Sequence, residues 1–232
     1  MMKEQKDKEL INSFLHAHQI ETIFNEPLIP HLSLYSFEQG EIICSQGDTA
    51  QYLYVLVEGK LKIYTTSAEG NTLILSFKTP LEVIGDIEYL RDIDIINTVE
   101  AVTPVHMIGV HYSYLEKYSK DYSPLLQFLL DIITRKFTIK SQSLSFHLFY
   151  PVEVRLASYL LSVSVDESDP LFNEHLSINI KDTANLIGTS YRHLNRVIGK
   201  FCTEGLIERN KGRIFIVNRE GLRMMAGKNI YE

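Results

Sequence analysis

The hydrophobic pattern changes its period once along this chain, near residue 120, and this change restricts the fold more than any other feature. From about His31 to His111, short runs rich in β-branched and aromatic residues alternate with glycine-containing turns. The predicted strands are residues 41–44, 52–57, 60–64, 72–77 and 105–110. Many short strands at such spacing predict a closed β-roll of about eighty residues.

A long helix is predicted after the β-roll. Ser123 offers a capping hydroxyl and Pro124 suits the first helical turn. Apolar residues then recur every three or four positions, and no further proline occurs until Pro151. Such a helix has more apolar surface than one β-roll covers. Packing against its twin in a dimer is one interpretation, and burial along its own domain is the other.

Pro151 begins a third region. A second helix is predicted over residues 152–161, followed by an acidic linker at 166–170 and a strand at 176–180. The whole pattern predicts an α+β fold in three parts. These are an N-terminal helical segment with a β-roll sensor (1–122), a dimerisation helix (123–149) and a C-terminal domain (150–232).

The formal net charge of −6 conceals a division between two parts of the chain. From Ser177 onward, ten Lys and Arg side chains accompany five acidic ones, which gives +5. The preceding 176 residues carry 13 basic and 24 acidic side chains, or −11. This division favours a basic functional module on an acidic body, although surface charges distributed unevenly without a function are the alternative.

Residues 180–201 have the spacing of a helix-turn-helix. Ala184 permits close approach of two helices, and Gly188 permits the left-handed turn between them. One face of the second helix is apolar, with the stripe Leu194, Val197, Ile198 and Phe201. The alternative is a helical hairpin whose polar face is merely solvated.

The polar face of this second helix suits duplex DNA. Arg192 and Arg196 can pair with guanine and Asn195 with adenine, while Thr189 or Ser190 caps the helix and meets a phosphate. A hairpin at 205–217, turning at 210–212, brings Arg209, Lys211 and Arg213 to its tip, where they clamp the DNA backbone or form a solvated turn. The predicted DNA-binding residues are Thr189, Ser190, Tyr191, Arg192, His193, Asn195, Arg196, Arg209 and Lys211.

Nearly the whole chain resembles the Crp/Fnr family of bacterial transcription regulators. The resemblance rests on the glycines at 40, 47, 59, 70 and 85 and on the segments 84–87, 152–161 and 184–198. It implies a cyclic-nucleotide-binding-like β-roll, a dimer helix from Ser123 and a winged helix with a recognition helix from Ser190 to about Cys202. It also implies a homodimer on palindromic DNA, with RNA polymerase as a partner.

The resemblance assigns roles to individual residues. Arg196 falls on the family's base-contacting arginine, and Tyr191, Arg192 and Asn195 occupy variable specificity positions. The family often has Glu where this chain has Arg192. We therefore expect a DNA site that differs from the family's best-known palindromes.

The same resemblance locates an effector site but argues against cyclic AMP. The ribose and phosphate elements correspond to Gly85, Asp86, Ile87, Ile95, Ile96 and Asn97. A buried phosphodiester needs a charge-assisted partner, yet no Lys or Arg occurs from Asp92 to Pro104. We expect an effector of unknown identity that is not cyclic AMP.

No cofactor or metal is predicted. Two cysteines cannot hold a four-cysteine iron–sulfur cluster, and Cys44 is either a redox thiol or a small buried residue. His106 and His111 are either haem ligands or structural.

Enzymatic motifs for nucleotide binding, nucleophilic hydrolysis and zinc proteolysis are missing from the sequence, so no enzyme is predicted. The alternatives are a ligand-sensing or scaffolding dimer whose C-terminal module binds protein, and a cupin-type β-roll enzyme. The cupin alternative is disfavoured because the strands contain no cupin-like metal set. The charged N-terminus and the lack of a membrane-spanning run predict a cytoplasmic protein without membrane contact.

Overall fold

The computed structural model describes residues 3–68, 70, 72–163, 180–210 and 213–227. The chain separates into two compact units, residues 1–137 and 138–232. The boundary between them falls within one long helix, so each unit is described by itself below. The sequence analysis divided the chain after residues 122 and 149 according to the functions expected of the parts. That division stays a prediction.

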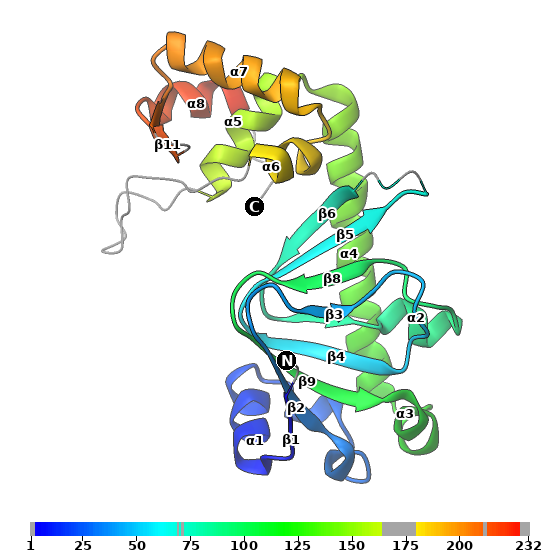
Figure 1. Ribbon diagram of the computed structural model, residues 1–232. Coiled ribbons are helices and arrows are strands. Elements are labelled where there is room, and N and C mark those ends of the chain that lie inside the picture. The colour runs from blue at the N-terminus through cyan, green and yellow to red at the C-terminus, as the bar shows by residue number, and fades with distance from the viewer. Residues whose placement is uncertain (1–2, 69, 71, 164–179, 211–212, 228–232) are drawn as a thin grey trace. The chain divides into compact units, whose positions relative to one another are not determined.

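Two antiparallel sheets form the β-roll of the N-terminal unit (Figure 1). The five-stranded sheet has the order β1 (Lys3–Gln5), β2 (Ser33–Phe37), β9 (Val105–His111), β4 (Tyr52–Glu58), β7 (Glu82–Ile84). The four-stranded sheet has the order β3 (Ile42–Cys44), β8 (Thr98–Ala101), β5 (Leu61–Thr66), β6 (Thr72–Lys78). The five strands predicted from the sequence are all present, and β1, β2, β7 and β8 are additional.

Helical segments accompany this roll. They are α1 (Lys8–Ala17), η1 (Glu21–Ile23), η2 (Ile29–His31), α2 (Asp86–Arg91), α3 (Tyr112–Tyr118) and the long α4 (Ser123–Phe149). The N-terminal helical segment expected from the sequence corresponds to α1.

Alternation along the strands gives the five-stranded sheet two buried faces. On one face, Tyr54 and Leu56 pack with Leu61 and Val99 of the other sheet, which forms the interior of the roll. On the opposite face, Leu53 and Val55 lie in a second core with side chains of α1 and α4. The β4–β5 turn needs Gly59, because a Cβ there would lie 2.3 Å from the carbonyl oxygen of Pro104.

The interpretation that the long helix is buried along its own domain describes only the beginning of α4, and packing against a second copy stays a prediction. Leu125, Leu129 and Ile132 are buried in the core of their own unit. Leu130 and Phe137, in contrast, leave 63% and 74% of their surface exposed. The beginning of the helix therefore packs on its own roll, and an apolar side of it stays uncovered.

The C-terminal unit is a helix-turn-helix with a two-stranded hairpin. Its elements are α5 (Val152–Val163), α6 (Ile180–Leu186), α7 (Tyr191–Thr203), β10 (Ile207–Asn210), β11 (Arg213–Ile216) and α8 (Arg219–Ala226). Its core contains fully buried side chains from five of these elements, among them Leu156, Leu194, Phe201, Ile207 and Leu222.

The predicted strand at 176–180 is wrong at its end, because Ile180 begins α6 and its side chain packs as a helical core residue. The rest of that strand and the linker at 166–170 lie outside the described residues. None of the helices in the described part of the chain has the length and apolar character needed to cross a bilayer.

Candidate nucleic-acid interface

The turn between α6 and α7 is built from backbone hydrogen bonds around Gly188. Its φ of +65° is the left-handed conformation that the sequence predicted. The N–H of Thr189 donates to the carbonyl oxygen of Ala184 at 2.9 Å, and Ala184 is buried between the helices. The turn therefore fixes the point at which the chain enters α7.

Ser190, rather than Thr189, caps α7. Its Oγ accepts a hydrogen bond from the backbone N–H of His193 at 3.2 Å. The Thr189 hydroxyl instead lies 3.4 Å from Nδ1 of His193. Both hydroxyls predicted to meet a phosphate thus lie at the N-terminus of the helix.

The two faces of α7 differ as predicted. Leu194, Val197, Ile198 and Phe201 are buried, whereas Tyr191 is 53% exposed. Arg192 and Arg196 are exposed, one turn apart, and neither guanidinium has a hydrogen-bond or ion-pair partner among the residues that the structure describes. An unpaired positive pair on a fixed helix is suited to bind an external anionic or acceptor-rich surface.

Asn195 lies between these arginines but is engaged within the protein. Its Nδ2 donates to the carbonyl oxygen of Tyr191 at 3.1 Å. Its Oδ1 accepts a hydrogen bond from Nη1 of Arg209 at 2.9 Å. The arginine predicted for the hairpin tip is therefore turned towards the recognition helix.

The hairpin itself is formed as predicted, with Arg209 paired to Ile214 and Asn210 to Arg213 across the two strands. Arg213 is exposed, and its side chain has no hydrogen-bond or ion-pair partner in the described part of the chain. Lys211, the remaining predicted backbone contact, lies outside the described residues.

Arg155 donates hydrogen bonds to the backbone of the turn between α6 and α7. The sequence did not predict this role. Arg155 lies on α5, is only 8% exposed, and its Nη1 donates to the carbonyl oxygens of Ile187 and Gly188. Buried guanidinium groups require such acceptors. A charged residue within an apolar helical run was the only sequence signal for this contact.

Asp86, which was predicted to contact an effector, instead forms an ion pair with a lysine of the same unit. It is 2% exposed, and both carboxylate oxygens accept hydrogen bonds from Nζ of Lys136 on α4, at 3.0 and 2.9 Å. Lys136 also donates to the Val83 carbonyl oxygen at 2.6 Å and pairs with Glu82 at 3.1 Å. A second lysine, Lys78, pairs with Glu82 at 2.7 Å.

The position of Gly85, the residue before Asp86, has no space for a side chain. Its φ is +87°, and a Cβ there would lie 2.3 Å from the carbonyl oxygen of Tyr52. Ile87 is half-buried in α2.

The other predicted effector residues differ in their exposure. Ile95 is buried, Ile96 is exposed and Asn97 is half-buried. The N–H of Ile96 donates to Oε1 of the buried Glu88 at 3.1 Å.

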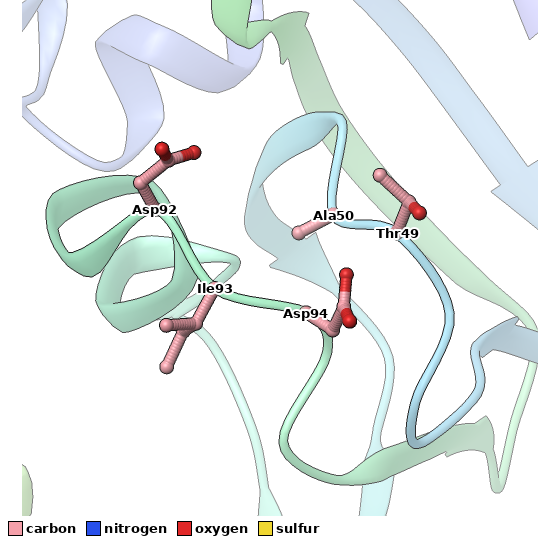
Figure 2. Close-up of a pocket in the computed structure, with 5 residues that line it drawn as sticks. All are labelled: Thr49, Ala50, Asp92, Ile93 and Asp94. Atoms are coloured by element: carbon pink, nitrogen blue, oxygen red, sulfur yellow. The ribbon is translucent and has the colours of Figure 1, made fainter.

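A pocket of about 380 Å³ lies beside this segment, between residues 49–50 and the turn after α2 (Figure 2). It is lined by Thr49, Ala50, Asp92, Ile93 and Asp94. None of the six predicted effector residues lines it, and its two charged side chains are acidic.

The residues considered for redox or haem chemistry are Cys44, His106 and His111, and each contacts other groups of the protein. Burial, aided by the charge of Glu88, raises the pKa of the Cys44 thiol to about 12, which disfavours the reactive thiolate. Nδ1 of His106 lies 2.9 Å from a carboxylate oxygen of Glu58, and Nδ1 of His111 lies 2.8 Å from Oγ of Ser113.

Comparison with known proteins agrees with both units. Residues 34–122 match the cyclic nucleotide-binding domain family, and residues 154–225 match the Crp-like helix-turn-helix domain family. The chain belongs to the Crp/Fnr family of transcription regulators.

Individual Crp/Fnr proteins are distant in sequence. The chain is 24% identical over 193 residues to the regulatory protein YeiL of Escherichia coli O157:H7, covering 83% of this chain and 85% of that one. It is 22% identical over 203 residues to a CRP-like cAMP-activated global transcriptional regulator of Mycobacterium tuberculosis, covering 86% and 90%. Its fold also matches the solved structure of the c-di-GMP-responsive regulator CLP of Xanthomonas campestris. That match has a TM-score of 0.72 at 18% identity and covers 84% and 97% of the two chains.

Membership in the Crp/Fnr family makes this chain a DNA-binding transcription regulator with a cyclic-nucleotide-binding-like domain and a helix-turn-helix. The helix-turn-helix consists of α6 and α7, so α7 is its second, or recognition, helix.

Proposed function

We propose that this Crp/Fnr regulator binds a palindromic promoter site as a homodimer and reads it with α7. One observation carries the proposal: α7 buries its apolar face completely and presents Arg192 and Arg196 outward without partners in the described part of the chain. Arg pairs bidentately with guanine in the major groove. Two copies of α7 would enter successive grooves, with half-sites one helical turn, ~34 Å, apart.

The uncovered side of α4 supports the homodimer. Leu130, Phe137 and Leu144 follow one another at seven-residue intervals along the helix, and all three are largely exposed. Apolar residues at this interval fall on one stripe and pack against a second helix in coiled coils. We assign residues 123–149 to dimerisation on this basis, with 1–122 as the sensor and 150–232 as the DNA-binding part.

A signal in the β-roll would shift the dimer helices and, through the junction at Tyr150-Pro151, reorient the winged helices. Such a change requires different affinities of the signal for the two arrangements. The rest of the proposal is a cytoplasmic protein that is not an enzyme and that contacts RNA polymerase on its promoter, as the family resemblance implies.

Replacement of Arg196 tests the assignment of α7. Arg196→Ala is expected to weaken binding to the preferred DNA site by about 1–3 kcal/mol, because a bidentate base contact is lost. Titration of labelled duplexes by fluorescence anisotropy measures the loss. Arg223→Ala, which removes one charge from a half-exposed position on α8, serves as the matched control and should have little effect. Equal losses for both variants would remove the assignment.

We further propose that cyclic AMP is not the effector. The carboxylate of Asp86 is already paired with Lys136, and the segment from Asp92 to Pro104 offers a phosphodiester no basic partner. Cyclic AMP and cyclic GMP at millimolar concentrations are therefore expected to leave the thermal unfolding midpoint unchanged. A ligand present at 100 times its Kd would add about 2.7 kcal/mol of stability, so a clear rise in the midpoint would contradict the proposal.

A further inference from the structure

Asn195 was predicted to read adenine, but its contacts suit a different role. A bidentate contact with adenine requires the donor and the acceptor of the amide to point together at the base. In the structure, Nδ2 is turned back to the carbonyl oxygen of Tyr191, one helical turn earlier, and Oδ1 is turned to Arg209 of the hairpin. Protein contacts on two sides thus fix the amide plane.

The hydrogen bond from Arg209 to Asn195 restricts the position of the Arg209 side chain. An exposed arginine side chain adopts many rotamers, and Arg192 and Arg196 on α7 add like charges near Asn195. Oδ1 of Asn195 accepts a hydrogen bond from Nη1 of Arg209 at 2.9 Å, which restricts the position of the guanidinium. A guanidinium has five N–H donors, so four remain for another acceptor.

We infer that Asn195 is a positioning residue that reads no base; this inference rests on the proposed DNA binding. It holds the Arg209 guanidinium against the recognition helix, where the guanidinium binds a backbone phosphate beside the groove that α7 enters. Arginine and phosphate form strong, charge-assisted hydrogen bonds, and such contacts orient a protein on DNA without conveying sequence.

A double-mutant cycle on the full-length protein tests this inference. Binding of Asn195→Ala, Arg209→Ala and the double variant to the preferred DNA site is measured at several salt concentrations. Arg209→Ala should lower affinity on the order of tenfold and reduce the salt slope by about 0.9, because one phosphate contact is lost. Asn195→Ala should produce a smaller loss of the same kind, and the double variant should be no weaker than Arg209→Ala alone.

Arg213 provides the matched control, because it lies on the same hairpin, carries the same charge and has a side chain without a hydrogen-bond or ion-pair partner among the described residues. The effects of Arg213→Ala and Asn195→Ala should therefore add. Base preference, measured with duplexes substituted at each position of the site, should not change in Asn195→Ala.

Two results would overturn the inference: additive effects of Asn195→Ala and Arg209→Ala, or a base preference that Asn195→Ala relaxes at one position. Failure of the unmodified protein to prefer any DNA sequence would instead refute the proposed function.

Discussion

Lys136→Ala is expected to lower the free energy of unfolding by about 3–5 kcal/mol, because it leaves two buried carboxylates without their shared partner. Asp86 loses both of its hydrogen bonds to Nζ, and Glu82 keeps Lys78 and the backbone N–H of Val83. The carbonyl oxygen of Val83 also loses its donor. Urea unfolding followed by circular dichroism measures the change.

The effect of Lys136→Ala should depend on pH in a defined direction. Burial by itself would raise the pKa of the Glu82 carboxyl, but the ammonium groups of Lys136 and Lys78 hold this pKa below its ordinary value of 4.5. A carboxyl whose pKa is lowered by folding stabilises the protein above its ordinary pKa. This stabilisation is lost as the pH falls through the lowered value. The difference between Lys136→Ala and the unmodified protein should be full at neutral pH and shrink below about pH 4.5.

Lys120→Ala is the control for this prediction. Lys120 pairs with Glu116 at 3.0 Å, but both side chains are more than half exposed, so its loss should change stability by no more than about 1 kcal/mol. If Lys136→Ala destabilises the protein no more than Lys120→Ala does, the contacts of Lys136 with Asp86, Glu82 and Val83 do not stabilise the fold as predicted here.

The second large effect is expected from Arg155→Ala. The substitution leaves the carbonyl oxygens of Ile187 and Gly188 without their buried donor and opens a cavity beneath the turn. We expect a loss of about 2–4 kcal/mol in the free energy of unfolding. DNA binding should weaken strongly as well, because this turn sets where Ser190 begins α7.

Two measurements check the Arg155 prediction together, urea unfolding and DNA titration by fluorescence anisotropy. Arg223→Ala again removes a positive charge from the same unit at a half-exposed position, and it should leave stability within about 0.5 kcal/mol. Full DNA affinity in a destabilised Arg155→Ala protein would show that the turn does not position the recognition helix.

Local patterns predicted those elements whose stability depends on nearby residues. Periodicity identified β4, β5 and β6 as well as α5, and the helix expected after Ser123 is α4. The turn at Gly188 and a cap at Thr189 or Ser190 could be predicted because each needs a particular residue type, and the structure shows the cap at Ser190. Length alone did not decide which strands could be predicted, because β1, β3 and β7 all have three residues and only β3 was predicted.

Contacts between distant parts of the chain could not be predicted in the same way. Lys136 and Asp86 are separated by 50 positions, and Arg209 and Asn195 by 14. The sequence showed that these side chains are polar, but not which of them meet. Asp86 was therefore assigned to an effector and Asn195 to a base, whereas the structure gives each of them a partner within the protein.

Selection of bound duplexes from a random DNA pool tests most directly whether α7 reads DNA. The unmodified protein is expected to enrich an inverted repeat whose half-sites lie one helical turn, ~34 Å, apart. Arg196→Ala should lose the preference for one base pair in each half-site. Enrichment of no sequence by the unmodified protein, or of the same repeat with unchanged preference by Arg196→Ala, would contradict the assignment of α7 as the reading helix.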